Sequence, residues 1–169
     1  MKIIQTIGYE GSSLEDFVAT LKAAQVEMLI DIRDLPVSRK RGFSKKALSA
    51  AIKSAGLEYL HLGDLGNPKP GREAARRGDM GASERIFRAR LTQADAQDAL
   101  REVVDLAARL QSCLLCFERD PAGCHRSIVA DAVAGLASME VRHLWVHRGL
   151  GKERAGIGGN ASGLGREVQ

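Results

Sequence analysis

The sequence predicts a three-layer α/β sandwich, in which helices cover both faces of a mainly parallel, five-stranded sheet. Strand-like and helix-like segments alternate along most of the chain, the order that builds parallel sheets. Residues 26–33 have a nearly continuous apolar centre, which is typical of a parallel strand covered on both faces. The 169 residues, 44% hydrophobic and 27% charged, suffice for one globular core. The simplest winding gives the Rossmann-like strand order 3-2-1-4-5.

The first strand and helix are predicted by a change in residue spacing. Residues 3–9 are rich in β-branched side chains and predict the first strand. Residues 12–24 predict a helix, because their apolar side chains recur at helical spacing. Ser12, followed three positions later by Glu15, resembles a capping box at the start of this helix. Pro36 ends the second strand.

The middle of the chain predicts a helix, a short strand and a long loop. Residues 44–55 have helical spacing, and Gly56 ends that helix. Residues 57–62 predict the third strand. Residues 63–81 contain several glycines and prolines together with arginines, so we expect an irregular loop of the kind that often carries function.

The second half repeats the alternation and ends in a glycine-rich segment. Helical spacing resumes near Ser83. The later segments predict a helix, a strand, a helix and a strand, in that order, at residues 95–110, 112–117, 124–136 and 141–146. We expect a single α/β domain at residues 1–148. Residues 149–169 hold seven glycines in 21 positions, so they predict a tail outside the core.

The composition excludes several classes of protein. The apolar runs are far shorter than the ~18 to 20 residues that a membrane span needs. No apolar stretch with a cleavage site follows Met1, and three cysteines do not make a disulfide framework. We therefore expect a cytoplasmic protein with reduced thiols and no membrane partner.

The charge balance favours an anionic partner. Lysine and arginine number 25 against 21 acidic residues, which gives a net charge of +4 at pH 7. This mild excess suits an anionic small molecule and predicts weak, salt-sensitive nucleic-acid binding at most. A basic run would carry that binding: Arg39, Lys40, Arg41, Lys45 and Lys46. An aromatic content of 4% disfavours stacking of bases along a single strand.

Two loops are the predicted place of a ligand site. In open parallel sheets, ligands bind at the carboxyl ends of the strands where the strand order reverses. In the predicted order this point lies between the first and fourth strands, so residues 8–13 and 118–126 should line one crevice. Gly8 and Gly11 allow close backbone approach there, and Ser12 begins a helix. No dinucleotide or Walker-type fingerprint is present.

The second loop carries the reactive side chains. Cys124 should open a helix beside Arg126, and both the helix dipole and the cation favour a thiolate. Cys124 would then be a nucleophile, with His125 and either Glu118 or Asp120 moving protons. The same helix start would equally seat an anionic group of a ligand.

Two other uses of the cysteines stay open. Cys116 and Cys124 could form a reversible redox pair, or Cys116 could be a buried, inert strand residue. A metal site is the least favoured, because Cys124 and His125 would point ~100° apart if both were helical. The sequence therefore predicts no metal ligands and no cofactor.

Several motifs together resemble a known family. They are Thr6–Gly11, Asp31–Arg33, Gly42–Ser44, Tyr59–Leu62 with Leu65–Gly66, and Cys116–Pro121 with Cys124–Arg126. In this order the chain resembles the family called "domain of unknown function 488" over residues 3–146. The resemblance implies an α/β fold and a polar site built from these motifs, including the cysteine motif, and it implies no particular reaction.

The remaining candidate residues follow other strands. Arg33 and Arg126 would bind anionic groups of the substrate, or Arg33 would form a structural ion pair with Asp31. Tyr9 and His61 are further candidates for the crevice, and each has a structural alternative.

We expect a small cytoplasmic enzyme that acts on an anionic substrate, for example one derived from a nucleotide. The alternatives are a non-catalytic ligand- or nucleic-acid-binding module and a thiol redox protein that uses Cys116 and Cys124.

Overall fold

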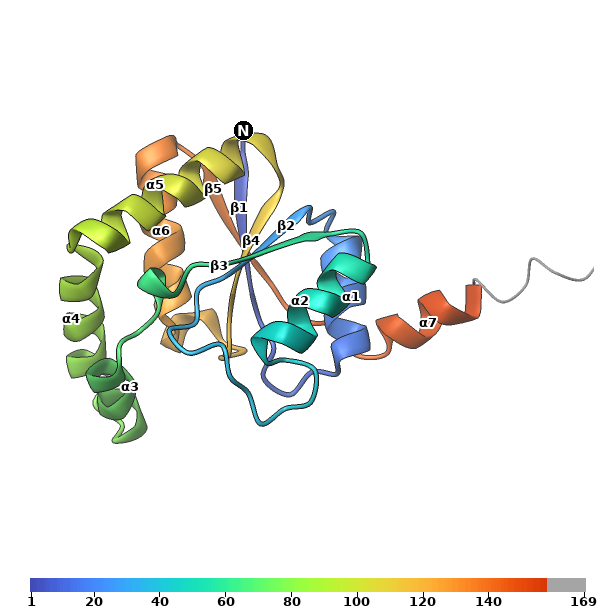
Figure 1. The fold of residues 1–169 in the computed structure, drawn as a ribbon, viewed down its shortest axis with the longest axis horizontal. Helices are drawn as coiled ribbons and strands as arrows, with labels where there is room; N and C mark the ends of the chain where they lie inside the picture. The colour runs from blue at the N-terminus through green and yellow to red at the C-terminus, as the bar shows by residue number, and fades with distance from the viewer. Residues whose placement is uncertain (158–169) are drawn as a thin grey trace, which may run out of the picture.

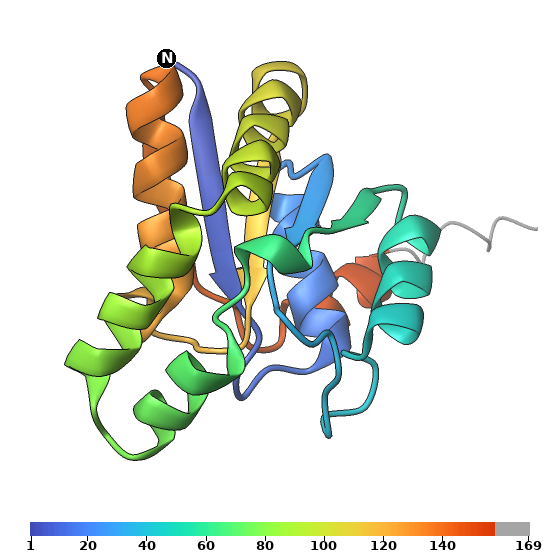
Figure 2. The same ribbon diagram turned by 60° about the vertical axis from the view of Figure 1, so that its left-hand side comes forward.

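A computed structural model describes residues 1–157 of the chain and has an α/β sandwich fold (Figures 1 and 2). The five strands are all parallel: β1 (Ile3–Gly8), β2 (Met28–Asp31), β3 (Glu58–His61), β4 (Ser112–Cys116) and β5 (Glu140–Leu144). The helices are α1 (Leu14–Ala23), α2 (Lys45–Ser54), α3 (Lys69–Arg76), α4 (Met80–Leu91), α5 (Ala94–Arg109), α6 (His125–Ala137) and α7 (Leu150–Ile157). Two short 3₁₀ turns are η1 (Gly63–Leu65) and η2 (Pro121–Gly123). The predicted fold class is confirmed.

The strand order differs from the predicted 3-2-1-4-5. It is β3-β2-β4-β1-β5, so β4 lies between β2 and β1. Every residue of β4 is buried, as expected of a central strand with neighbours on both sides. The pairing sets Gly8 of β1 beside Cys116, and Asp31 of β2 beside Leu115. As a result, the loops that follow β1 and β2 both flank the carboxyl end of β4.

Helices on the two faces of the sheet enclose two apolar cores. Phe17 and Leu21 of α1 and Leu48 of α2 pack on one face. The other face is covered by α4, α5 and α6, which place side chains such as Phe87 and Val129 against the strands. Figure 2 shows these two groups of helices on opposite sides of the sheet. Since α1 follows β1 and α6 follows β4, the chain leaves these adjacent strands toward opposite faces. The loops after the two strands are in contact with each other, and residues 8–13 do not line the pocket that Cys124 reaches, contrary to the shared crevice predicted for residues 8–13 and 118–126.

The segment at residues 63–81 is more regular than its composition predicts. It contains η1 and α3, and α4 already begins at Met80. Pro70 lies in the first turn of α3, where its missing N–H costs no helical hydrogen bond. The Arg72 guanidinium donates to the carbonyl of Asn67 (2.9 Å) and forms an ion pair with Asp34. These contacts hold a helix that glycine and proline content alone does not predict.

The start of α1 also differs from the prediction. The cap is Ser13, whose Oγ accepts a hydrogen bond from the Asp16 N–H at 3.1 Å. The backbone N–H of Ser12 instead donates to the Tyr9 carbonyl, within the turn that follows β1. The predicted capping box between Ser12 and Glu15 is therefore wrong by one residue.

Part of the predicted tail is a helix that contacts the domain. The backbone N–H groups of Gly149 and Gly151 each donate to the Asp16 carboxylate at 3.0 Å. These hydrogen bonds lower the pKa of Asp16 and attach the start of α7 to α1. Residues 158–169 of the predicted tail lie outside the described residues. Within residues 1–157, no helix combines the length and apolar character that a membrane crossing requires.

Candidate functional site

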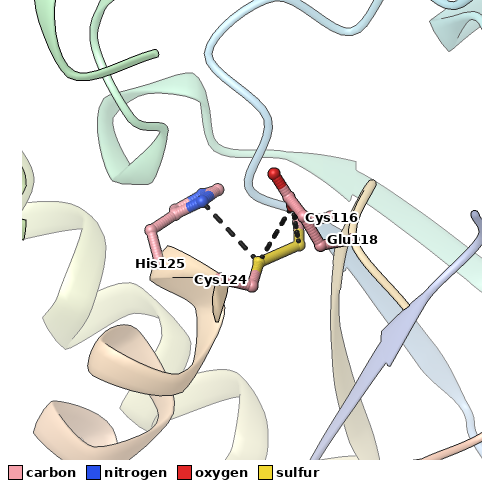
Figure 3. Close-up of side chains that lie close together, drawn as sticks. All are labelled: Cys116, Glu118, Cys124 and His125. Atoms are coloured by element: carbon pink, nitrogen blue, oxygen red, sulfur yellow. Dashed lines mark hydrogen bonds between the residues drawn. A yellow bond between two sulfur atoms is a disulfide. The ribbon is translucent and has the colours of Figure 1, made fainter. Parts of the chain in front are cut away.

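The site forms where β4 ends and α6 begins (Figure 3). β4 ends at Cys116, and the chain then turns through η2 to Cys124, the N-cap residue of α6. Glu118 lies on the connecting loop, and His125 is the first residue of the helix. Four chemically active side chains from ten consecutive positions therefore meet at one point.

The two cysteines of the site are joined. Cys116 and Cys124 form a disulfide that closes a loop between residues eight positions apart. Both cysteines are buried, with exposed fractions of 1% and 5%. The Oε2 atom of Glu118 lies 3.1 Å from the Cys116 sulfur and 3.2 Å from the Cys124 sulfur. Burial raises the pKa of Glu118, and the nearby Arg126 charge opposes that rise. Once the disulfide is reduced, the carboxyl group can exchange a proton with either thiol.

His125 has one ring nitrogen fixed and the other directed at the sulfur pair. Its Nε2 atom lies 3.2 Å from the carbonyl oxygen of Ile32, which can only accept, so Nε2 carries the proton. Its Nδ1 atom lies 3.9 Å from the Cys124 sulfur (Figure 3). Burial lowers the pKa of His125 to about 4, and the Arg126 charge adds to this effect. The ring is neutral near pH 7, with the Nδ1 lone pair facing the sulfur.

Arg126 is a fully buried cation behind the cysteines. It donates from Nε to the Thr6 hydroxyl at 3.1 Å, and its other nitrogens donate to the carbonyls of Glu118 and Arg119. Its NH1 atom lies 3.3 Å from the Cys116 sulfur. Burial lowers the pKa of Arg126. No carboxylate within residues 1–157 lies at ion-pair distance from this guanidinium, so once the disulfide is reduced the nearest group able to carry a negative charge is the Cys116 sulfur.

A pocket of about 270 Å³ opens beside the sulfur pair. α4 lines one side of it, and the loop after β4 with the first turn of α6 lines the other. Glu118, Cys124 and His125 all reach its surface. Arg88 on the opposite wall donates to Glu84 at 2.8 Å, so the nearest cation in the lining is already paired. The pocket gives a small molecule or side chain access to Cys124.

Arg33 follows the end of β2, and its guanidinium donates hydrogen bonds to other residues of the protein. Its guanidinium forms a buried, two-pronged ion pair with Asp31, with Nε at 2.8 Å and NH2 at 2.7 Å from the carboxylate. Its NH1 also donates to the Phe43 carbonyl at 2.7 Å and to the Tyr9 hydroxyl at 3.2 Å. Burial alone would lower the pKa of Arg33, but the hydrogen bonds and charge of Asp31 raise it. The geometry fits the structural ion pair weighed above.

The other candidate residues surround the site without entering the pocket. Tyr9 is buried and stacks on Phe43, with ring centroids 4.4 Å apart. His61 contacts the Arg33 carbonyl through Nε2 at 2.7 Å, and Asp120 accepts from the Ala122 N–H within η2. Two further candidates lie in the loop after β1: Gly11, which has a φ of +72°, and Ser12, which is buried.

Gly8 has a direct effect on the position of Glu118. A side chain at Gly8 would overlap the carbonyl group of Glu118, whose oxygen passes over the end of β1. The backbone N–H of Glu10 donates to the Phe117 carbonyl at 2.9 Å and continues this contact. The glycine lets the loop after β4 cross the strand end, so the backbone that approaches Gly8 closely is that of Glu118 and not a ligand.

The comparison with known families agrees with the motifs. The sequence profile of the family described as "Domain of unknown function DUF488" matches residues 13–133. The chain belongs to this family. No curated protein and no solved structure matches it. The matched region of this DUF488 protein contains all four residues that meet at the end of β4.

Two contributors to the DUF488 site come from other segments of the sheet, and although both lie in the motifs of the resemblance, no role was predicted for either. Thr6 of β1 holds Arg126, and the carbonyl of Ile32 after β2 orients His125. The contact with Ile32 depends on β2 lying next to β4, which the predicted strand order did not include. Thr6 could have been found, because a polar residue inside a buried parallel strand needs a hydrogen-bonding partner.

Proposed function

We propose that this DUF488 protein is a thiol–disulfide oxidoreductase whose redox pair is Cys116 and Cys124. The observation that carries the proposal is the joined sulfur pair beside a pocket, with one carboxylate oxygen next to both sulfurs. Redox-active cysteines need a partner thiol, a proton carrier and access for the substrate. These three requirements meet at the end of β4.

The two cysteines differ in ways that assign their roles. Cys124 lines the pocket and caps α6, where its sulfur lies 3.5 Å from the backbone nitrogen of Arg126. The helix N-terminus stabilises a thiolate at this position, so Cys124 is the attacking thiol. Cys116 lies deeper, at the end of the central strand, and is the resolving thiol.

The reaction is an exchange in which a substrate disulfide is reduced. The Cys124 thiolate attacks one substrate sulfur and releases the other as a thiolate, which takes up a proton. The Cys116 thiol gives its proton to Glu118 and attacks the Cys124 sulfur of the mixed disulfide, releasing the second substrate thiol. The substrate gains two electrons, and the cysteine pair loses two as its disulfide forms. A dithiol reductant returns the pair to its reduced state.

The hypothesis of an anionic substrate receives less support than thiol exchange. Arg33 and Arg126 were its expected anchors, but their donors are directed at protein acceptors, and neither residue lines the pocket. Arg88 is the pocket's cation, and it is paired with Glu84. The contacts of these three arginines therefore give no reason to expect that the pocket prefers an anionic substrate.

Trapping of the exchange intermediate tests the proposed function. The reduced full-length protein is treated with oxidised glutathione, and the products are mapped by mass spectrometry. Wild-type protein should release two glutathione molecules and form the Cys116–Cys124 disulfide. Cys116→Ser should instead stop at a mixed disulfide on Cys124, whereas Cys113→Ser should behave as wild type. Equal capture of glutathione by Cys124→Ser, or no exchange by the wild type, would overturn the proposal.

Alkylation rates provide a second, independent prediction. In the reduced protein, Cys124 should react with iodoacetamide more than about tenfold faster than Cys113 near neutral pH. Burial raises the pKa of the Cys113 thiol, whereas Cys124 lies at a helix N-terminus and on a pocket. Timed quenching followed by peptide mass spectrometry gives both rates. Equal rates would contradict the assignment of Cys124 as the attacking thiol.

The basic run before and at the start of α2 predicts only weak nucleic-acid binding. Arg39, Arg41, Lys45 and Lys46 are exposed, and none of them forms an ion pair within residues 1–157. Phosphate contacts of this kind weaken steeply as salt rises. In electrophoretic titration, binding should disappear at physiological salt, with or without replacement of Arg39, Lys40 and Arg41 by alanine. Tight binding that persists at that salt and is lost in the triple variant would favour a nucleic-acid-binding module.

A further inference from the structure

We infer that the reduced protein binds one Zn²⁺ ion through Cys116, Glu118, Cys124 and His125. One donor atom from each of these residues lies within 4.8 Å of every other. Two sulfurs, an imidazole nitrogen and a carboxylate oxygen are the donor types that zinc takes in proteins, at about 2.0–2.3 Å. Small side-chain rotations suffice to bring four atoms from this separation onto one tetrahedral ion.

The backbone spacing of the cysteines suits a shared metal ion. Their Cα atoms are 7.7 Å apart, wider than the range of about 4.4–6.8 Å seen in most disulfides. Two thiolates bound to one tetrahedral zinc ion have sulfurs ~3.8 Å apart, because each Zn–S bond is about 2.3 Å long. The wide Cα separation therefore accommodates sulfurs that are held apart by an ion once the disulfide is reduced.

The orientation of His125 is that of a metal ligand. Zinc-bound histidines commonly donate their second ring N–H to a backbone carbonyl, which fixes the ring and the tautomer. The Nε2 atom of His125 makes this contact with Ile32, so Nδ1 presents its lone pair to the cluster. The expectation that Cys124 and His125 diverge assumed that both are helical. Cys124 has extended dihedral angles, with φ −118° and ψ 138°, so its side chain turns toward the histidine.

The surrounding charge also matches a zinc–thiolate cluster. Two thiolates and the Glu118 carboxylate carry three negative charges, and Zn²⁺ leaves one of them uncompensated. Arg126 supplies one buried positive charge, with NH1 3.3 Å from the Cys116 sulfur. A buried cation without a charged partner is costly, so a cluster with a single negative charge stabilises Arg126 as well as the ion.

Zinc binding and the disulfide use the same sulfurs and exclude each other. The inference concerns the thiols of the proposed redox pair, but it does not depend on their exchange with a substrate. Oxidation of the pair, by whatever disulfide, removes two of the four ligands and should release the ion.

Metal titration of the reduced, full-length protein tests the inference. The protein is reduced, freed of reductant without oxygen, and titrated with Zn²⁺ against a chromophoric chelator. Co²⁺ is used as a spectroscopic probe of sulfur ligation and tetrahedral geometry. We expect one equivalent of either ion, with Co²⁺ spectra that show thiolate charge transfer. Cys124→Ser and His125→Ala should each weaken Zn²⁺ binding by more than the 10–100-fold typical of changes outside the ligand set.

Matched controls separate the cluster from other metal-binding groups. Cys113→Ser removes the third thiol, and His147→Ala removes an exposed histidine; neither should change the affinity or stoichiometry. Protein oxidised to the disulfide should bind no ion. Absence of stoichiometric binding to the reduced protein, or binding unaffected by Cys124→Ser and His125→Ala in folded protein, would overturn the inference.

The glutathione experiment, run on the same samples without metal, distinguishes the two proposals. Exchange without zinc binding leaves the proposed function intact and removes the metal site. Zinc binding without exchange supports the metal site and overturns the proposed oxidoreductase function.

Discussion

Replacement of Gly8 by alanine should destabilise the protein by about 3 kcal/mol or more, at the upper end of what overpacking costs. The added methyl group would overlap the carbonyl group of Glu118. The methyl group would be fixed to the backbone at the end of β1, and the atoms that it meets belong to the backbone of the loop after β4, so no flexible side chain can move aside. Relief requires that the loop after β4 shifts away from β1, which displaces Glu118 from the sulfurs.

Gly123→Ala is the matched control for this change. Gly123 lies in the same loop, but a Cβ atom there meets nothing within 4 Å. Its effect on the free energy of unfolding should stay within about 0.5 kcal/mol. Urea denaturation followed by circular dichroism measures both variants, and the iodoacetamide assay reports the site. If Gly8→Ala matched Gly123→Ala in both measurements, the close approach of the two loops would be wrong.

Arg126→Gln should cost roughly 3 kcal/mol or more of stability, because several buried acceptors lose their donor at once. These acceptors are the Thr6 hydroxyl and the carbonyls of Glu118 and Arg119. Glutamine is shorter, and its single amide group cannot reach all three. The change also removes the only buried cation beside Cys116 within residues 1–157, so the cysteine thiols should become less acidic.

Arg119→Gln provides the control for loss of an arginine at the same end of the sheet. Arg119 is exposed and lies over the Trp145 ring, 5.8 Å from its centre, a contact worth about 0.5–1 kcal/mol. Equilibrium unfolding should therefore rank Arg126→Gln well below Arg119→Gln in stability. Similar stabilities would show that Arg126 is not the residue that fastens the loop after β4.

Local patterns predicted most of the elements, and contacts between distant segments account for the errors. Helical spacing and β-branched runs are properties of neighbouring residues, so each strand was found within a few positions. The strand order depends on which strands lie next to each other. Nothing within residues 112–116 alone shows whether β4 lies between β2 and β1 or on the other side of β1. Likewise α3 depends on contacts of Arg72 with Asn67 and Asp34, which helix propensity does not include.

The same division applies to the candidate site. The cluster from Cys116 to His125 was predictable because one short segment carries all of it. The direction of the His125 side chain was not, since it depends on the N-cap dihedral angles of Cys124 and on the carbonyl of Ile32. The interpretation of Arg33 as an anchor for substrate shared this weakness. A neighbouring Asp31 is visible in the sequence, but the buried contacts with Tyr9 and Phe43 are visible only in the fold.

The central position of β4 has a consequence for how the chain acquires its structure. β1 and β2 emerge first during synthesis, yet they do not pair with each other, because residues 112–116 lie between them. The first half of the chain can therefore form helices and the β2–β3 pair. β1 can pair only with β4 and β5, which lie more than a hundred residues further along the chain. Such distant pairings slow folding. Since β4 also contributes Cys116, we expect the site around the two cysteines to form only after this distant pairing has been made.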